Sequence, residues 1–396
     1  MDFFLTMLAT VLSMYFMAIT AYLCVIAVAA YFFKKRVSRE GRPMRLAVVI
    51  PAHNEEMHIA ETVGSLFASH YPRELYEVFV IADNCDDRTA ARALQAGSRV
   101  FSRVDPSMRG KGQAVDWFLR SHGHVLAFAD AIVMIDADTW VDKEFLREMA
   151  ASLRYPGVAA VQGYYGVANA RAAWRSGLLS AAFHVFNHLR PAGHRRLGGT
   201  AGLRGNGMAF KKEVLAGGWP AHSIVEDYEF SVMLLLRGIV VDYNPDAMVF
   251  SDMPTERKVA ETQRMRWEGI DPRIKHRLRR LMFRKLAGEP RIRYLDALID
   301  SFVPPLALIV LGQSLLFVMA LMLRSPLVVP LACCFCIDMF YVLSGLILRG
   351  AGAAEWRSLL KAPSYMLWKI AVYFKMRNQD ASVWNRTERP SGLPGA

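Results

Sequence analysis

Long uncharged stretches lie near both ends of the chain, and alternating apolar and polar runs fill the segment between them. The first stretch runs from Phe3 to Phe33 and is followed at once by Lys34, Lys35 and Arg36. About 20 apolar residues are enough to cross a bilayer, so this stretch is predicted to be a membrane-spanning helix. A cleaved signal peptide would be shorter, and its positive charge would come before the apolar run.

Two further apolar runs, 301–323 and 325–348, are separated by a very short loop around Arg324 and predict an antiparallel helical hairpin. Between 273 and 293, nine residues are Lys or Arg. The positive-inside rule therefore places the segment between the spans in the cytoplasm and the amino terminus outside. Asp338 lies deep in the last run, where a carboxylate is costly and hence a functional candidate. It could face a groove for a lipid-linked acceptor, pair with a neighbouring subunit, or stay protonated.

Two basic segments are amphipathic and are not predicted to span. In 273–286 the apolar residues recur near helical spacing (Ile274, Leu278, Leu281, Met282 and Leu286), and 365–377 mixes aromatic residues with lysines and an arginine. Both are predicted to lie as helices in the headgroup layer. No nucleic-acid-binding signature accompanies the basic residues, so a nucleic-acid partner is not expected.

The middle of the chain has the pattern of an α/β domain. Short apolar runs rich in β-branched residues predict strands at 46–50, 76–83, 131–138 and 158–165, and the segments 55–69 and 87–96 suit helices. Such alternation predicts a mostly parallel sheet, whose ligands bind outside the carboxyl ends of the strands. Polar clusters with acidic residues follow three of these strands, at 51–56, 83–87 and 136–138. A frayed strand end capped by Asp138 would explain one cluster but not three.

Composition narrows the chemistry. Hydrophobic residues make up 53% of the chain, which points to membrane segments. The net charge of +12 fits an anionic lipid surface, nucleic acid or a phosphorylated substrate. Four of the five cysteines lie in apolar runs and the set is no disulfide framework, so the cysteines are interpreted as reduced thiols and the globular part is expected to face the cytosol. Neither a dinucleotide GxGxxG, a P-loop, zinc-ligand spacing nor a GxSxG elbow is present. A carboxylate pair that could bind Mg²⁺ or Mn²⁺ together with substrate phosphates remains.

Seven motifs in order resemble those of membrane-embedded family-2 glycosyltransferases with the GT-A fold. They are VVIPAHNEE (48–56), IADNCDDRT (81–89), RGKGQAVDW (109–117), DAD (136–138), RGNGMAF (204–210), VEDYEF (225–230) and QRMRW (263–267). The likeness extends to cellulose, chitin and hyaluronan synthases and to bacterial exopolysaccharide enzymes. Val225 stands where those synthases usually have Thr, and only two clear spans follow the domain, fewer than the large synthases use.

This resemblance implies roles for individual residues. Asp227 would be the catalytic base, and Glu226 a second-shell or acceptor-orienting group; the alternative is a pair of acids favoured by a helix start. Asp136 and Asp138 would hold the metal, and Asp83 would contact the nucleotide base unless it merely caps the following helix. The nucleotide sugar would be bound by Pro51, His53, Glu55, Asp83, Lys111, Asp136, Gln263, Arg266 and Trp267. The acceptor would be bound by Gly205, Asn206, Gly207 and Trp267, although Trp267 could also be a core residue.

The expected architecture has five parts. They are an N-terminal transmembrane helix (1–36), a Rossmann-like GT-A domain (45–270), a basic interfacial segment (271–298), a transmembrane hairpin (299–349), and an interfacial helix with a cytoplasmic tail (350–396). The expected enzyme is an inverting hexosyl- or N-acetylhexosaminyltransferase in the cytoplasmic membrane, using Mg²⁺ or Mn²⁺ and a nucleotide sugar, with UDP favoured by analogy.

We expect its acceptor to be a lipid-linked or short glycan in cell-envelope or exopolysaccharide synthesis, with membrane lipids as partners. The main alternative is a processive synthase that extends and secretes a polymer, as a homo-oligomer or with polysaccharide-export partners. A transporter or receptor with a nucleotide-binding domain is disfavoured because three spans are few for transport. An inactive scaffold is disfavoured because both the DAD pair and Asp227 are intact.

Overall fold

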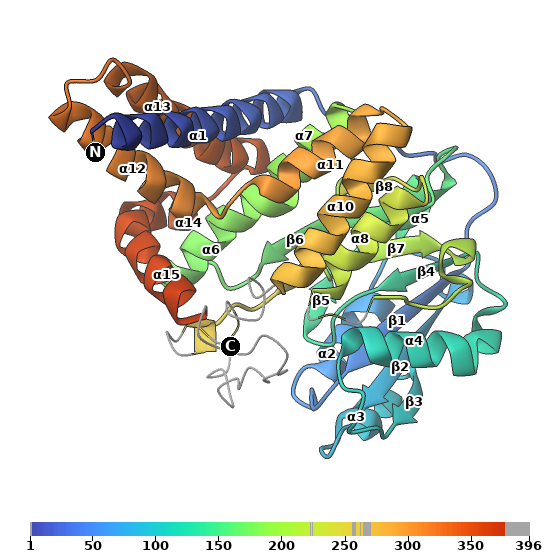
Figure 1. Ribbon diagram of the computed structural model, residues 1–396. Coiled ribbons are helices and arrows are strands. Elements are labelled where there is room, and N and C mark those ends of the chain that lie inside the picture. The colour runs from blue at the N-terminus through green and yellow to red at the C-terminus, as the bar shows by residue number, and fades with distance from the viewer. Residues whose placement is uncertain are drawn as a thin grey trace.

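The computed structural model describes residues 2–221, 223, 225–255, 259–261, 263 and 271–376. Its centre is one eight-stranded sheet in the order β3-β2-β1-β4-β7-β6-β8-β5 (Figure 1). The strands are β1 (Leu46–Ala52), β2 (Tyr76–Asp83), β3 (Arg99–Arg103), β4 (Ala131–Met134), β5 (Thr139–Val141), β6 (Ala160–Val167), β7 (Met208–Lys211) and β8 (Val241–Ser251). The first four strands in the order are parallel, whereas β7 runs antiparallel to both β4 and β6. The sheet is therefore mixed but mostly parallel, as predicted.

Helices cover both faces of the sheet. Those of the central domain are α2 (Ile59–Phe67), α3 (Thr89–Gln95), α4 (Lys111–His122), α5 (Phe145–Arg154), α6 (Trp174–His184), α7 (Arg190–Arg196) and α8 (Glu226–Leu236). Alternate β1 side chains point to opposite faces: Val48 packs in a core with α2, α3 and α5, and Val49 in a core with α4 and α8. The result is a three-layer α/β/α domain.

The remaining helices are α1 (Asp2–Tyr31), α10 (Pro272–Gly288), α11 (Ile292–Phe302), α12 (Leu306–Met322), α13 (Val328–Arg349), α14 (Ala353–Ser358) and α15 (Ala362–Met376). Two described helices are long and apolar enough to cross a membrane. They are α1, over Thr6–Tyr31, and the whole of α13. The predicted span at 301–323 is less regular, because α12 reaches that length only together with α11, from which it bends by 67°.

The apolar helices pack directly on the central domain. Leu23 and Ile26 of α1 belong to the same core as Leu189 and Ala192, which come from the segment α6–α7. Close approach requires glycine here, since a Cβ on Gly193 would lie 2.3 Å from the carbonyl oxygen of Ile26. In this part of the molecule, α1 packs against α7 and α13, and α13 packs against α6 (Figure 1). The domain is therefore held in one orientation against these helices.

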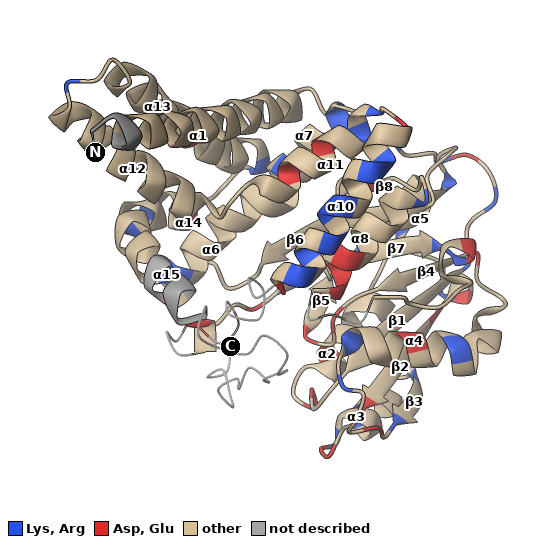
Figure 2. Ribbon diagram, viewed as in Figure 1, with Lys and Arg blue, Asp and Glu red and all other residues tan. Residues whose placement is uncertain are grey.

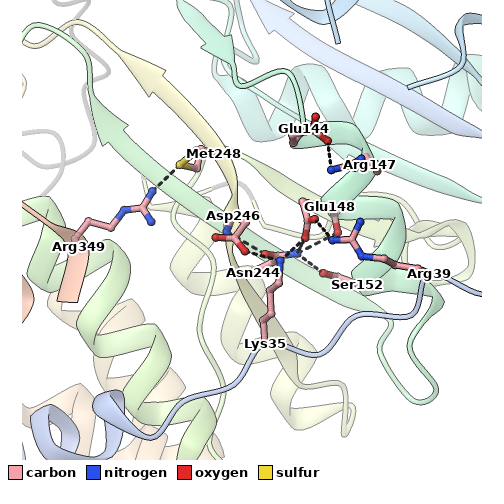
Figure 3. A network of polar contacts seen from close by, with 10 residues as sticks. All are labelled: Lys35, Arg39, Glu144, Arg147, Glu148, Ser152, Asn244, Asp246, Met248 and Arg349. Atoms are coloured by element: carbon pink, nitrogen blue, oxygen red, sulfur yellow. Dashed lines mark hydrogen bonds and ion pairs between the residues drawn. The ribbon is translucent and has the colours of Figure 1, made fainter. Parts of the chain in front are cut away.

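A polar network fixes the linker that follows α1 (Figure 3). Lys35 binds both Glu148 of α5, at 2.7 Å, and Asp246 of β8. Arg39 binds the other carboxylate oxygen of Glu148 at 2.8 Å, and Asn244 donates to the same side chain at 3.0 Å. Because Glu148 is buried and joins two side chains of the linker to Asn244 of β8, the linker cannot swing freely on the sheet.

The environment of α10 corrects one expectation. Leu278 and Met282 were predicted to face lipid, but both are fully buried against Val232 of α8. Arg277 of the same helix donates to Glu229 of α8 at 2.6 Å. Leu281 and Phe283 of this helix are exposed. The apolar face of α10 thus packs on α8 and α11, and the interfacial position of the segment stays a prediction.

Asp338 of α13 finds a partner inside the chain. Thr20 of α1 donates to its Oδ1 at 3.3 Å, and Gln313 of α12 donates to Thr20 at 2.7 Å. These contacts tie three helices together at one level. Its other oxygen has no hydrogen-bond partner among the described residues. The structure therefore shows Asp338 hydrogen-bonded to another helix of the same chain.

Candidate active site

Three polar clusters meet at one edge of the sheet, as their positions after parallel strands predicted. The register pairs Ala52 of β1 with Ala82 of β2, and Val49 of β1 with Met134 of β4. The residues that follow these strands are therefore neighbours. β4 ends earlier than expected, at Met134, so Asp136 and Asp138 lie in the turn between β4 and β5. Both are half-buried, whereas Ala137 between them is buried.

Lys111 lies at the centre of this edge. It is the first residue of α4, and its Nζ lies 2.5 Å from Asp136 Oδ1 and also donates to the carbonyl oxygen of Gly205. Burial alone would lower the pKa of Lys111, but the nearby carboxylates of Asp136 and Glu226 outweigh it and the pKa is raised. The side chain is therefore a fixed cation between the metal-binding candidates and the acceptor-binding candidates.

Glu226 and Asp227 form the first turn of α8, which raises the question of whether they are only helix-start acids. A helix dipole would lower their pKa values. Instead, burial and the neighbouring charge of Asp227 raise the pKa of Glu226 to about 7, and burial also raises the pKa of Asp227. Asp227 Oδ1 accepts a hydrogen bond of 2.7 Å from the backbone N–H of Tyr228. A carboxyl group held in this way has the basicity that proton abstraction needs.

The turn at 205–207 passes close to Asp227. Gly205 and Gly207 have φ values of 76° and 64°, a region that favours glycine. A Cβ on Gly205 would lie 3.4 Å from Asp227 Oδ2, and one on Gly207 would lie 2.9 Å from Val249. The two glycines therefore allow a tight turn beside the candidate base, where an acceptor would have to approach.

Asn206 has a structural task in this turn. Its side chain is completely buried, donates to Thr139 Oγ1 at 2.7 Å and accepts from the backbone N–H of Asp136 at 3.2 Å. Thr139 is in turn hydrogen-bonded to Ser251 at 2.8 Å. Asn206 thus holds the Asp136 turn in place, and its predicted contact with an acceptor stays a prediction.

The nucleotide-binding candidates lie after β1 and β2. Asp83 does not cap the following helix, since Asp87 accepts from the backbone N–H of Thr89 at 2.9 Å. Asp83 is instead buried against Arg103 of β3, with 2.6 Å between Nη1 and Oδ1. Sequence reasoning missed Arg103, although its position at the end of a strand next to β2 pairs it directly with Asp83.

His53 links the ends of β1 and β2. Its Nδ1 lies 2.8 Å from the carbonyl oxygen of Asp83, and Pro51 is part of β1 itself. Thr89 Oγ1 accepts from the backbone N–H of Glu55 at 2.7 Å. His53, Glu55 and Asp83 are thus brought together around two adjacent loops. Gln263 is buried, whereas Arg266 and Trp267 lie outside the described residues.

A divalent cation fits the donors at Asp136 and Asp138. Carboxylate oxygens are hard ligands, and the Lys111 ammonium already occupies a cation position against Asp136. In the part of the chain that the structure describes, no group of three or more His, Cys, Asp or Glu side chains could hold a metal. The carboxylate pair would therefore share the cation with oxygens from a substrate.

The sequence is similar to those of known glycosyltransferases. The chain is 26% identical over 233 residues to the probable glycosyltransferase YdaM of Bacillus subtilis (strain 168), covering 56% of this chain and 54% of that protein. It is 27% identical over 237 residues to a beta-monoglucosyldiacylglycerol synthase of Trichormus variabilis (strain ATCC 29413 / PCC 7937), covering 57% and 49% respectively. The chain thus spans about half the length of these curated relatives.

The fold has a counterpart among solved structures. The mannosyltransferase PcManGT from Pyrobaculum calidifontis, in complex with GDP-Man and Mn²⁺, aligns with a TM-score of 0.53 and 18% identity over 90% of this chain and 99% of that one. At this identity the likeness shows the GT-A-like fold alone. The family model described as "Glycosyltransferase like family 2" matches residues 43–269, more than half of the chain. The chain therefore belongs to glycosyltransferase family 2.

Proposed function

We propose that this protein is an inverting, metal-dependent glycosyltransferase that moves a sugar from a nucleotide sugar to a lipid-linked or short glycan acceptor at a membrane surface. The observation that carries the proposal is the contact of Lys111 with both Asp136 and the Gly205 turn, beside Glu226 and Asp227. One cation therefore joins the donor-side carboxylate to the acceptor-side turn. Family membership and the GT-A-like fold support it.

The donor would bind across the carboxyl ends of β1, β2 and β4. Asp83, positioned by Arg103, would contact the nucleotide base, with His53 and Glu55 on the adjoining loop. Lys111 would bind the diphosphate, because an ammonium forms strong charge-assisted hydrogen bonds to phosphate oxygens. Its contact with Asp136 would then be exchanged for one with the substrate. Gln263, Arg266 and Trp267 are kept as further donor contacts on the resemblance alone.

Asp136 and Asp138 would hold Mg²⁺ or Mn²⁺, which supplies charge neutralisation at the leaving diphosphate when bound. The protein's own part is to hold these carboxylates in position. Asn206 does so through the Asp136 backbone N–H, and Thr62 does so by donating to the Ala137 carbonyl oxygen at 2.8 Å. The turn is thus anchored on both sides before any ligand arrives.

Asp227 would take the proton of the acceptor hydroxyl. As that oxygen forms its bond to the anomeric carbon, the bond to the diphosphate breaks and the nucleoside diphosphate leaves from the opposite face. A single displacement of this kind inverts the anomeric centre. Glu226 would orient the acceptor, and its raised pKa makes it a neutral hydrogen-bond donor below pH 7.

A lipid-linked acceptor is favoured by the surroundings of α8. The basic helix α10 packs against it, and in Figure 2 the blue Lys and Arg positions along the α10 ribbon lie beside the red acidic positions of α8. Arginines at a membrane surface attract the phosphate groups of lipids. The name of one relative, beta-monoglucosyldiacylglycerol synthase, denotes a glycosylated lipid. The runner-up remains a processive synthase working as an oligomer.

The two alternatives differ in their product. The purified full chain should be reconstituted in vesicles with labelled nucleotide sugar outside, and the product should be extracted and sized. The proposal predicts label in the lipid extract or in short glycans. A high-molecular-weight polymer trapped in the lumen, with no other protein present, would instead establish the processive synthase. No transfer from any nucleotide sugar, with the protein still folded, would contradict the proposed activity itself.

A further inference from the structure

Two adjoining cavities lie where α1 ends and the linker that follows it begins. Their volumes are about 390 Å³ and about 300 Å³, and Arg36, Arg195 and Asp242 line both of them. Binding sites for small ligands fall in the same size range. The smaller cavity is also lined by Phe32 and Phe33, immediately after the apolar segment of α1 that ends at Tyr31.

These cavities are remote from the candidate active site. Asp136 follows the carboxyl end of β4, and β6 is parallel to β4 because both are antiparallel to β7. The larger cavity is lined by Val158 and Ala159, just before β6, and by Val240, just before β8. It therefore lies at the opposite edge of the sheet, and a ligand there could not be the sugar donor.

The walls are strongly cationic. Five Lys or Arg side chains line the two cavities, against a single carboxylate: Lys34, Arg36, Arg195, Arg196 and Arg293, with Asp242. Arg195 is 8% exposed and is held by hydrogen bonds to Asp242 Oδ1 at 2.8 Å and to the Gly199 carbonyl oxygen at 2.5 Å. The other four cations form no ion pair with residues that the structure describes. An anionic ligand would relieve this excess of charge.

Two buried side-chain atoms in the larger cavity have no hydrogen-bond partner among the described residues, and one is a donor while the other is an acceptor. The Nε of Arg293 is a donor, and the Oδ2 of Asp242 is an acceptor, and neither forms a hydrogen bond with the described residues. Buried polar groups are normally paired, so each needs an explanation. A ligand with both a phosphate oxygen and a hydroxyl group would satisfy the two atoms together. A bare phosphate would satisfy only the arginine well.

The geometry points to a binding site for the headgroup of an anionic phospholipid that carries a hydroxyl donor, as phosphatidylglycerol does. The phosphate would lie among Arg36, Arg195 and Arg293, and the headgroup hydroxyl would donate to Asp242. The acyl chains would leave past Phe32, which is 63% exposed beside the end of the apolar helix. Such a lipid would hold the linker against the sheet edge, in addition to the Lys35–Glu148 contact.

The test uses the full chain in neutral detergent without nucleotide sugar, so that it does not depend on transfer activity. Short-chain phosphatidylglycerol is titrated while the thermal unfolding midpoint is followed, since a ligand that binds the folded state raises it. Short-chain phosphatidylcholine and inorganic phosphate are titrated in parallel. The variant Lys34→Gln/Arg36→Gln/Arg293→Gln is compared with Lys143→Gln/Arg147→Gln/Lys212→Gln, which removes the same charge from exposed positions outside the cavities.

We expect phosphatidylglycerol alone to raise the midpoint, and the cavity variant to weaken the apparent affinity at least tenfold while the control variant retains it. If the cavity variant does not fold, Arg36→Gln alone replaces it, because that side chain is exposed. An equal shift with phosphatidylcholine, or an equal loss in the control variant, would overturn the inference. An equal shift with inorganic phosphate that the cavity variant abolishes would make this a free-phosphate site and overturn the lipid assignment.

Discussion

The Nζ atom of Lys111 lies 2.5 Å from Oδ1 of Asp136, although 25 residues separate them in the chain. Lys111 begins α4 and Asp136 follows β4, so the contact depends on how the sheet brings these elements together. The same ammonium donates to the Gly205 carbonyl oxygen. An anionic substrate would have to draw Lys111 away from at least one of these partners.

Replacement of Lys111 by Met should therefore lower kcat/KM for the nucleotide sugar by about 10²-fold or more, because charge-assisted hydrogen bonds to phosphate are lost. Lys111→Arg should retain a larger share of the activity, since it keeps the positive charge. Steady-state kinetics with both variants checks this. Equal activity of Lys111→Met and the wild-type protein would remove Lys111 from the donor site.

Asp227→Asn should bind the nucleotide sugar almost as well as the wild-type protein. Its turnover should be lower by about 10²-fold or more, as expected for a lost general base. Because burial raises the pKa of Asp227, wild-type activity should also fall on the acid side at a higher pH than an ordinary aspartate would give. Binding titrations and pH–rate profiles measure the two effects. A variant that binds poorly but turns over normally at saturation would exclude Asp227 as the base.

The burial of Glu226 should appear in the pH dependence of stability. Its pKa is raised to about 7 in the folded chain, so the folded state binds its proton more tightly than the unfolded state does. This contribution is complete below pH 4.5 and is lost as the pH rises to about 7. Glu226→Gln mimics the protonated form and should leave stability unchanged at pH 5.

At pH 8 the same variant should be more stable than the wild-type protein by on the order of 1–3 kcal/mol. Denaturant unfolding at the two pH values is the measurement. Asp138→Asn, on the half-buried turn nearby, is a control for removal of one acidic charge. A pH-independent difference between wild type and Glu226→Gln would mean that Glu226 is ionised in the folded protein at both pH values.

Sequence reasoning located the acidic clusters because the carboxyl ends of parallel strands meet at one edge, whatever the details of packing. It extended β4 to residue 138, since the apolar pattern does not reveal where the chain turns into β5. It also missed β8, whose sequence includes Asp242, Asn244, Pro245 and Asp246 and so lacks an apolar run. Contacts such as Lys111–Asp136 depend on tertiary packing and leave no local signal.

Arg103 is a residue that only the structure brings to the site. Arg103→Met would leave the buried carboxylate of Asp83 without its charged partner, so we expect a loss of about 3 kcal/mol of stability and weaker nucleotide binding. Denaturant unfolding and nucleoside diphosphate titration would measure both. Arg99→Met, on the exposed part of the same strand, is the matched control and should change neither by much. Unchanged nucleotide affinity in Arg103→Met would mean that Asp83 does not contribute to nucleotide binding.

The most direct test of the central claim is transfer of a labelled sugar from nucleotide sugars by the purified full chain, measured with Mg²⁺ or Mn²⁺ and again in excess chelator. We predict transfer only with the metal, restoration when the metal is added back, and no transfer by Asp136→Asn or Asp138→Asn variants that still fold. Full activity in excess chelator, or in either variant, would contradict the account.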